Sequence, residues 1–159
     1  MTTVLVIGAN RGIGLEFTMQ YLARGDNVIG TCRDVTGASA LTQLQAENDN
    51  LQLLTLDVSS DDSLAAFPAQ LGGRAIDIFI NNAGVYGPRD SVFGNVDEQN
   101  WLPVLRINSI APMLLTQLII DNLIKGQDKK LLYVTSKMGS IDDNKGGGSY
   151  VYRSSKAAL

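Results

Sequence analysis

Short apolar runs alternate with longer segments of mixed polarity along this chain. Each run is rich in aliphatic residues and is closed by a glycine or a polar residue, which is typical of a strand buried in a parallel sheet. We therefore predict strands at residues 4–7, 28–31, 51–56, 76–80 and 131–135.

The segments between the runs carry apolar residues at helical spacing. In the first segment Ile13, Phe17 and Tyr21 recur on one face, and Gly25 is placed to end the helix. Ser60 is placed to cap another helix at its N-terminus. We predict helices at residues 12–24, 39–47, 60–71 and 97–125, with a last one opening near residue 150.

Two prolines interrupt these helical patterns. Pro68 predicts a kink or an early end of the helix at residues 60–71. Pro112 predicts a bend in the long helix and a backbone carbonyl that needs another partner.

Strand and helix alternate throughout, which predicts an α/β fold with a doubly wound parallel sheet of Rossmann type and right-handed crossovers. No internal repeat or linker divides residues 1–159, so we expect one domain. A complete fold of this type has about six strands. The pattern supplies five, and the sequence stops three residues after Lys156. We therefore expect the C-terminal part of the fold to be missing.

Composition narrows the class of protein. The 159 residues are 45% hydrophobic and 18% charged, which is ordinary for a globular domain. The apolar stretch at residues 107–120 is broken by Asn108, Pro112 and Gln117, so no membrane span is expected. The N-terminus has no basic leader, and Cys32 is the only cysteine; both features favour the cytoplasm.

Charge and histidine content exclude several kinds of site. The net charge is −3 and the charged residues are scattered along the chain. They form no basic stripe that would indicate nucleic-acid binding. The chain has no histidine, which excludes Ser-His-Asp hydrolysis and histidine-ligated zinc. We expect no metal, and acid–base chemistry must fall to Tyr, Lys, Asp or Glu.

Three glycines lie between the first strand and its helix. Gly8, Gly12 and Gly14 stand where a turn can bring the backbone close to a pyrophosphate and where a helix offers free N–H groups. The spacing therefore predicts a dinucleotide site. The alternative is a tight turn that binds nothing.

Several motifs occur in an order that resembles the short-chain dehydrogenase/reductase family, and most closely its C-factor and Sniffer-like carbonyl reductase branch. The resemblance extends over the whole chain, although Ile7 stands where the family usually has a threonine that tethers the glycine turn. The motifs are Gly8-Ala9-Asn10-Arg11-Gly12-Ile13-Gly14, Asn81-Asn82-Ala83-Gly84, Asn108, Ser136 and Tyr152-x3-Lys156.

The end of the second predicted strand bears on the choice of cofactor. A carboxylate there favours NAD, whereas a guanidinium favours the 2′-phosphate of NADP. Cys32 stands where an NAD-preferring relative has its acid, Arg33 follows, and Arg11 is a second cation of the glycine loop. We predict NADP(H). The alternative is that Arg33 is only a solvated loop residue.

The resemblance also implies further cofactor contacts. Asp57, with Val58 beside it, corresponds to the family residue that binds the adenine amino group, although a helix-capping aspartate is equally consistent with the sequence. Asn81, Ala83 and Gly84 correspond to the segment that closes over the adenosine ribose.

Tyr152 and Lys156 are one helical turn apart, and a nearby ammonium group favours the phenolate form of a tyrosine. The resemblance makes Tyr152 the general acid and base and gives Lys156 a second contact, with the nicotinamide ribose. It makes Ser136 a hydrogen-bond donor to the substrate oxygen. It also makes Asn108 the residue whose carbonyl holds a water near the lysine. The alternative is that Asn108 is only a structural amide near Pro112.

The function predicted is an NADP(H)-dependent oxidoreductase that interconverts a small carbonyl compound and an alcohol. Relatives pair through the long helix and the tyrosine-bearing helix, so the resemblance also implies a homo-oligomer. The competing hypothesis is a truncated, inactive nucleotide-binding or interaction module.

Overall fold

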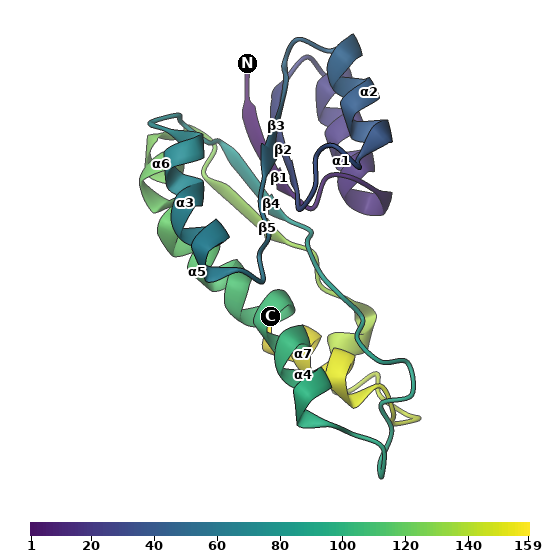
Figure 1. Ribbon diagram of the computed structural model, residues 1–159. Coiled ribbons are helices and arrows are strands. Elements are labelled where there is room, and N and C mark those ends of the chain that lie inside the picture. The colour runs from purple at the N-terminus through teal and green to yellow at the C-terminus, as the bar shows by residue number, and fades with distance from the viewer.

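The computed structural model describes residues 1–159 and contains one five-stranded sheet (Figure 1). All neighbouring strands are parallel, and their order is β3-β2-β1-β4-β5. The strands are β1 (Thr3–Ile7), β2 (Asn27–Cys32), β3 (Leu51–Thr55), β4 (Ile78–Asn81) and β5 (Lys130–Tyr133). The predicted doubly wound α/β fold is therefore confirmed.

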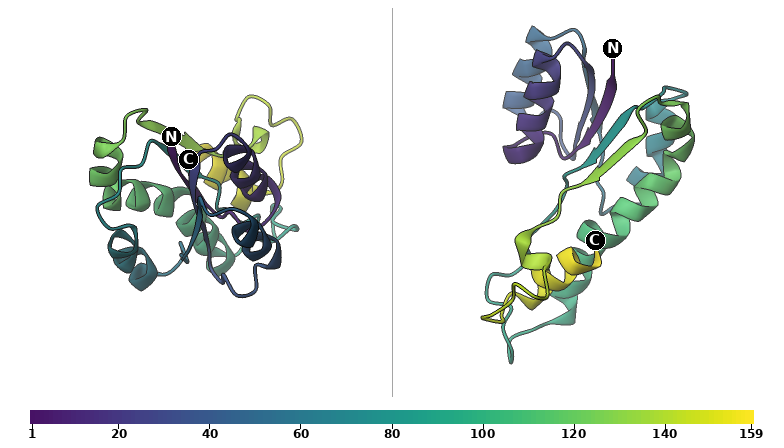
Figure 2. Two further views of the ribbon diagram at one scale, coloured as in Figure 1. Left: turned by 90° about the horizontal axis from the view of Figure 1, so that it is seen from above. Right: turned by 180° about the vertical axis from the view of Figure 1, so that it is seen from behind.

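Helices cover both faces of the sheet. Helices α1 and α2 lie on one face, and α3, α5 and α6 lie on the other (Figure 1, Figure 2). The bounds are α1 (Gly12–Ala23), α2 (Ser39–Glu47), α3 (Asp61–Leu71), α4 (Glu98–Leu105), α5 (Ala111–Leu118), α6 (Ile120–Lys125) and α7 (Tyr150–Ala158). None of these helices combines the length and hydropathy needed to cross a bilayer.

The sheet separates two hydrophobic cores. Leu5 and Ile7 of β1 point into the core that contains residues of α3 and α5, whereas Val4 and Val6 point into the core that contains residues of α1 and α2. Alternation along a strand sends successive side chains to opposite faces, so a run that is apolar throughout serves both cores. This explains why β1 is hydrophobic from Val4 to Ile7.

The prediction of one long helix at residues 97–125 is wrong in detail. The segment is divided into α4, a π-helical turn (Arg106–Ile110), α5 and α6. Pro112 lies in the first turn of α5, where its missing N–H group is tolerated, and the π turn comes directly before it. Pro68, by contrast, lies inside α3 without ending it, since that helix continues to Leu71.

All strands end at the same edge of the sheet because they are parallel. Helices α4 and α7, with the loops around them, extend beyond this carboxyl edge (Figure 2). The chain crosses to opposite faces after β1 and after β4, which are neighbours in the sheet. Crevices at such a switch point are where doubly wound folds bind ligands.

Candidate functional site

A cavity of about 580 Å³ opens at the carboxyl edge of the sheet. Its walls come from the residues that follow β1, β2, β3 and β4. Most of the residues predicted to bind a cofactor line it: Gly8, Asn10, Arg11, Gly12, Ile13, Arg33, Asp57, Val58, Ala83 and Gly84. The structure therefore gathers these residues around one cavity, and their contact with a cofactor stays a prediction.

The turn after β1 is held close to the end of β4. Gly8 has φ of 78°, and a Cβ there would lie 3.1 Å from the backbone of Ala83. The Asn82 side chain donates a hydrogen bond of 2.9 Å to the Gly8 carbonyl, and the N–H groups of Gly8 and Ala9 donate to the Thr31 carbonyl. These bonds tether the turn where Ile7 offers no hydroxyl group.

Gly14 does not line the cavity. A Cβ at this position would lie 2.0 Å from the Gly8 carbonyl oxygen and 2.5 Å from the Asn82 amide nitrogen. The glycine therefore allows the first turn of α1 to pack against the end of β1. Asn82, which the motif contained without a predicted role, is the residue that locks this arrangement.

The N-terminus of α1 fits an anionic group. Its first turn contains no acidic residue, and its N-cap residue, Arg11, makes no side-chain capping bond. The amide N–H groups of this turn are thus free of an internal anion, at the positive end of the helix dipole. The pyrophosphate of a dinucleotide is a suitable partner for them.

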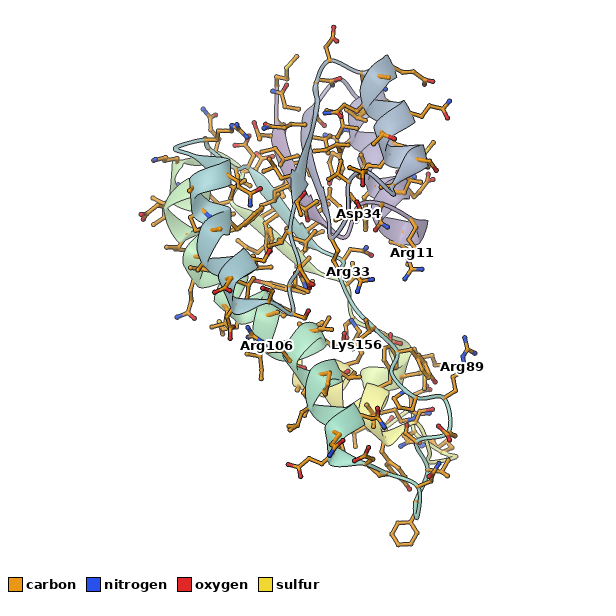
Figure 3. The ribbon with its side chains drawn as sticks, in the orientation of Figure 1. Arg11, Arg33, Asp34, Arg89, Arg106 and Lys156 are labelled. Atoms are coloured by element: carbon orange, nitrogen blue, oxygen red, sulfur yellow. The ribbon has the colours of Figure 1, made fainter.

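Arg11 and Arg33 both border the cavity, and both side chains extend into the space beyond the sheet edge (Figure 3). The intervening part of the wall includes Cys32, whose thiol has a pKa raised by burial. Asp34 also lines the cavity, which sequence reasoning missed. Its carboxylate accepts hydrogen bonds from the Thr36 hydroxyl (2.6 Å) and the Gly37 N–H (3.1 Å), and these bonds hold its pKa below the usual value.

Asp57 faces the cavity while belonging to the turn before α3. Its carboxylate accepts bonds from the Ser59 hydroxyl (2.6 Å) and the Ser59 N–H (2.9 Å). The Ser59 hydroxyl is the main cause of the low pKa of Asp57, and the Arg33 charge adds to it. The capping of helix α3 itself is done by Ser60, as predicted, through a bond from the Ser63 N–H. Asp57 thus remains charged and borders the cavity beside Arg33.

Asn81 ends β4 and is buried in the sheet, outside the cavity. Ala83 and Gly84 reach the cavity directly. The motif therefore divides into Asn81, which lies outside the cavity, and three residues that line it, of which Asn82 also ties its side chain to the Gly8 carbonyl.

Lys156 is nearly buried on α7, with 7% of its surface exposed. Its ammonium group donates a hydrogen bond of 2.8 Å to the Val134 carbonyl, just beyond β5, and burial lowers its pKa. A Cβ on Gly84 would lie 3.5 Å from Lys156 Nζ. The lysine therefore faces the carboxyl edge of the sheet, in the region where Figure 3 places it below Arg33.

Asn108 is fully buried in the π turn. Its amide accepts a bond of 2.9 Å from the Val85 N–H, donates one of 2.8 Å to the Val85 carbonyl, and donates one of 2.9 Å to the Ser155 hydroxyl. The side chain thus joins the loop after β4 to α7. These side-chain bonds agree with a structural role, and the contact of the Asn108 carbonyl with a water near the lysine stays a prediction.

Tyr152 lies one turn before Lys156 on α7 and is half-buried. Ser136 follows β5, and its hydroxyl accepts a bond of 3.2 Å from the Met138 N–H. The Thr135 hydroxyl next to it bonds to the Lys156 carbonyl. The structure therefore places Ser136 in a turn packed against α7 and brings Asn108 and Lys156 together around Gly84.

Comparison with known proteins decides the family. The protein-family model for short chain dehydrogenase matches residues 2–159. This chain belongs to the short-chain dehydrogenase family. The match begins at the first strand and includes both the glycine turn and the Tyr152-x3-Lys156 pair.

One protein similar in sequence and two similar solved structures show how much of the chain is matched. A 1-hydroxy-2-glutathionyl-2-methyl-3-butene dehydrogenase of Rhodococcus sp. (strain AD45) is 34% identical over 99% of this chain, which spans 66% of that protein's length. A carbonyl reductase from Pseudomonas aeruginosa PAO1 in complex with NADP has a TM-score of 0.90 at 31% identity. The match covers 100% of this chain and 72% of the reductase chain. The carbonyl reductase Sniffer of D. melanogaster has a TM-score of 0.89 at 28% identity. The match covers 100% of this chain and 71% of the Sniffer chain.

Proposed function

We propose that this short-chain dehydrogenase is an NADP(H)-dependent oxidoreductase that interconverts a carbonyl compound and an alcohol, with residues 1–159 acting as one dinucleotide-binding and catalytic domain. The observation that carries the proposal is the cavity itself, which is bordered by Arg11 and Arg33, with Lys156 facing the same edge of the sheet. The NADP-bound reductase from Pseudomonas aeruginosa supports the choice of cofactor.

The residues around the cavity suit the parts of a dinucleotide phosphate. The free N–H groups at the start of α1 would hold the pyrophosphate, together with Asn10 and Ile13 of the same turn. Arg33 would pair with the 2′-phosphate, and Arg11 would add a second positive charge. Asp57 would accept a bond from the adenine amino group, with Val58 against the ring, and Ala83 and Gly84 would leave room for the ribose.

The bound nicotinamide supplies or accepts the hydride, and the chain supplies the proton and the orientation. In reduction, the Tyr152 hydroxyl gives its proton to the carbonyl oxygen; in oxidation, the phenolate takes a proton from the alcohol. The Lys156 ammonium group stabilises the phenolate from one helical turn away. The Ser136 hydroxyl donates a hydrogen bond to the substrate oxygen, and Asn108 holds the neighbouring loop against α7.

An assay of NADPH oxidation with a panel of aldehydes and ketones tests this proposal. We expect turnover with wild-type protein and a loss of at least about a hundredfold in Tyr152→Phe, since general acid–base catalysis contributes about 10² to 10⁴ in rate. Binding of NADPH, followed by fluorescence, should be retained in the variant. Tyr150→Phe is the matched control, because Tyr150 lies on the same helix and has Ser154 rather than lysine four residues later.

Two results would contradict the proposal in different ways. Turnover by Tyr152→Phe at the wild-type rate would exclude the tyrosine mechanism. Tight NADPH binding without turnover on any carbonyl compound would favour the nucleotide-binding module instead.

A further inference from the structure

The loop that follows Gly84 is fixed more firmly than its lack of regular structure implies. Asn108 binds both the N–H and the carbonyl of Val85. Two residues later, a Cβ on Gly87 would lie 2.8 Å from Val104 of α4 and 3.3 Å from Val151 of α7. The residue between these anchors, Tyr86, is thus held on a backbone that packs against both helices.

The Tyr86 side chain is held at its far end as well. Its hydroxyl forms a hydrogen bond of 3.0 Å with the Ser149 hydroxyl, and the Met138 sulfur lies 3.9 Å away. Ser149 directly precedes α7 and has a left-handed backbone with φ of 48°, a conformation that costs energy for a residue other than glycine. Its side chain makes no bond that caps α7. The Ser149 carbonyl accepts the Arg153 N–H at the start of α7, and the Ser149 side chain is left to bond with Tyr86.

Between these two attachments the Tyr86 ring stacks on the ring of Tyr152. The centroids are 4.5 Å apart and the planes differ by 22°. Stacked rings at such a separation attract each other beyond their buried area. The Arg89 guanidinium lies 5.8 Å from the Tyr86 centroid and adds a cation–π contact.

The stack has a consequence for the tyrosine that the proposed function makes the proton donor. Lys156 is fixed by its bond to the Val134 carbonyl, whereas the ring of Tyr152 is oriented by Tyr86. Tyr86 comes from a different part of the chain, 66 positions before Tyr152, so the local Tyr-x3-Lys pattern contains no sign of it. A misplacement of a reacting group by about 1 Å can cost about a hundredfold in rate.

We propose that Tyr86 is a positioning residue for Tyr152: its ring, anchored by Ser149 and by the loop bound to Asn108, holds the phenol at the angle from which its hydroxyl reaches the substrate oxygen. This inference rests on the proposed function, because it assigns Tyr86 a role in the reaction that Tyr152 performs. Tyr86 itself does not transfer the proton.

Steady-state kinetics of three variants test the role. Tyr86→Leu removes the aromatic stack, and we expect kcat to fall about tenfold while KM and the Kd for NADPH stay within about twofold. Tyr86→Phe keeps the stack and loses the Ser149 bond, and its kcat should stay within about threefold of wild type. Tyr150→Leu is the matched control, because Tyr150 is 37% exposed against 38% for Tyr86, and it should behave as wild type.

Near-ultraviolet circular dichroism supplies a readout that does not need turnover. Coupled tyrosine rings should give a band that Tyr86→Leu and Tyr152→Leu each remove and Tyr150→Leu leaves intact. A wild-type kcat in Tyr86→Leu, a rise confined to KM, or equal losses in the Phe and Leu variants would overturn the positioning role. If wild-type protein shows the band but no turnover, the proposed function fails and the positioning role fails with it, while the stacking of the two rings is supported. If the band is absent, the stacking itself is refuted.

Discussion

In the proposed function, the preference for NADPH over NADH depends most directly on Arg33. It follows the buried Cys32 at the end of β2 and borders the cavity together with Asp57 and Asp34. The Asp34 carboxylate is charged and bonded to Thr36 and Gly37, whereas the Arg33 guanidinium forms no ion pair within the chain and is therefore available for a phosphate. A carboxylate in its place would repel a 2′-phosphate.

Arg33→Asp should therefore weaken NADPH binding by at least about thirtyfold, since each 1.4 kcal/mol is tenfold in affinity and a like-charge contact costs several kcal/mol. NADH binding should change much less. Titration calorimetry with both cofactors measures the ratio, with Arg74→Asp, at the opposite edge of the sheet, as the control. An unchanged ratio of the two Kd values would refute the assignment of Arg33.

Lys156 gives the free energy of unfolding a specific pH dependence. Burial lowers its pKa below the 10.5 of an exposed lysine, so between these two values the unfolded chain binds more protons than the folded chain. Stability contributed by this site therefore rises with pH through that window. Urea unfolding of wild type and Lys156→Met between about pH 7 and about pH 10 should show wild type gaining relative to the variant. A difference that is independent of pH, or that is matched by the exposed Lys145→Met, would contradict this explanation.

At the scale of elements, the sequence predicted the features that depend on residues close together in the chain. The glycine turn, the cap at Ser60 and the pairing of Tyr152 with Lys156 on one helix are local patterns, and the structure has all three. The side chain of Asn82, by contrast, bonds to a residue 74 positions away, and that of Asn108 to one 23 positions away. Contacts of this kind have no periodic signal. Asn108 itself lies in the π turn that the structure has where the sequence predicted a simple bend at Pro112.

The packing of the glycine turn makes a prediction about stability. Gly14→Ala places a Cβ 2.0 Å from the Gly8 carbonyl oxygen, so the turn or α1 must shift. We expect a loss of about 3 kcal/mol in the free energy of unfolding, the upper part of the range for overpacking. Gly146→Ala, where no atom lies within 4 Å of the added Cβ, should stay within about 0.5 kcal/mol. Equal urea midpoints for the two variants would show that the turn is not tightly packed.

At the scale of the whole molecule, exposed apolar side chains gather on the segment from α4 to α5. Leu102, Ile110 and Met113 are each about half exposed or more. Burial of such a surface would support the homo-oligomer that the family resemblance implies. Ile110→Asp should therefore lower the mass measured by light scattering to that of a monomer, whereas Met19→Asp on α1 should not. A wild-type protein that is already monomeric at high concentration would exclude this association.

At the scale of the whole molecule, the proposed function joins the cavity at the carboxyl edge to Tyr152 and Lys156 on α7. Transfer of an isotopic label tests that junction most directly. NADPH with deuterium at both hydrogen positions of the reactive nicotinamide carbon is supplied with the best carbonyl substrate of the panel, and the product alcohol is examined by mass spectrometry. Hydride transfer from the nicotinamide should leave one deuterium on the carbinol carbon. An alcohol formed without deuterium, or no alcohol at all, would contradict hydride transfer by this protein.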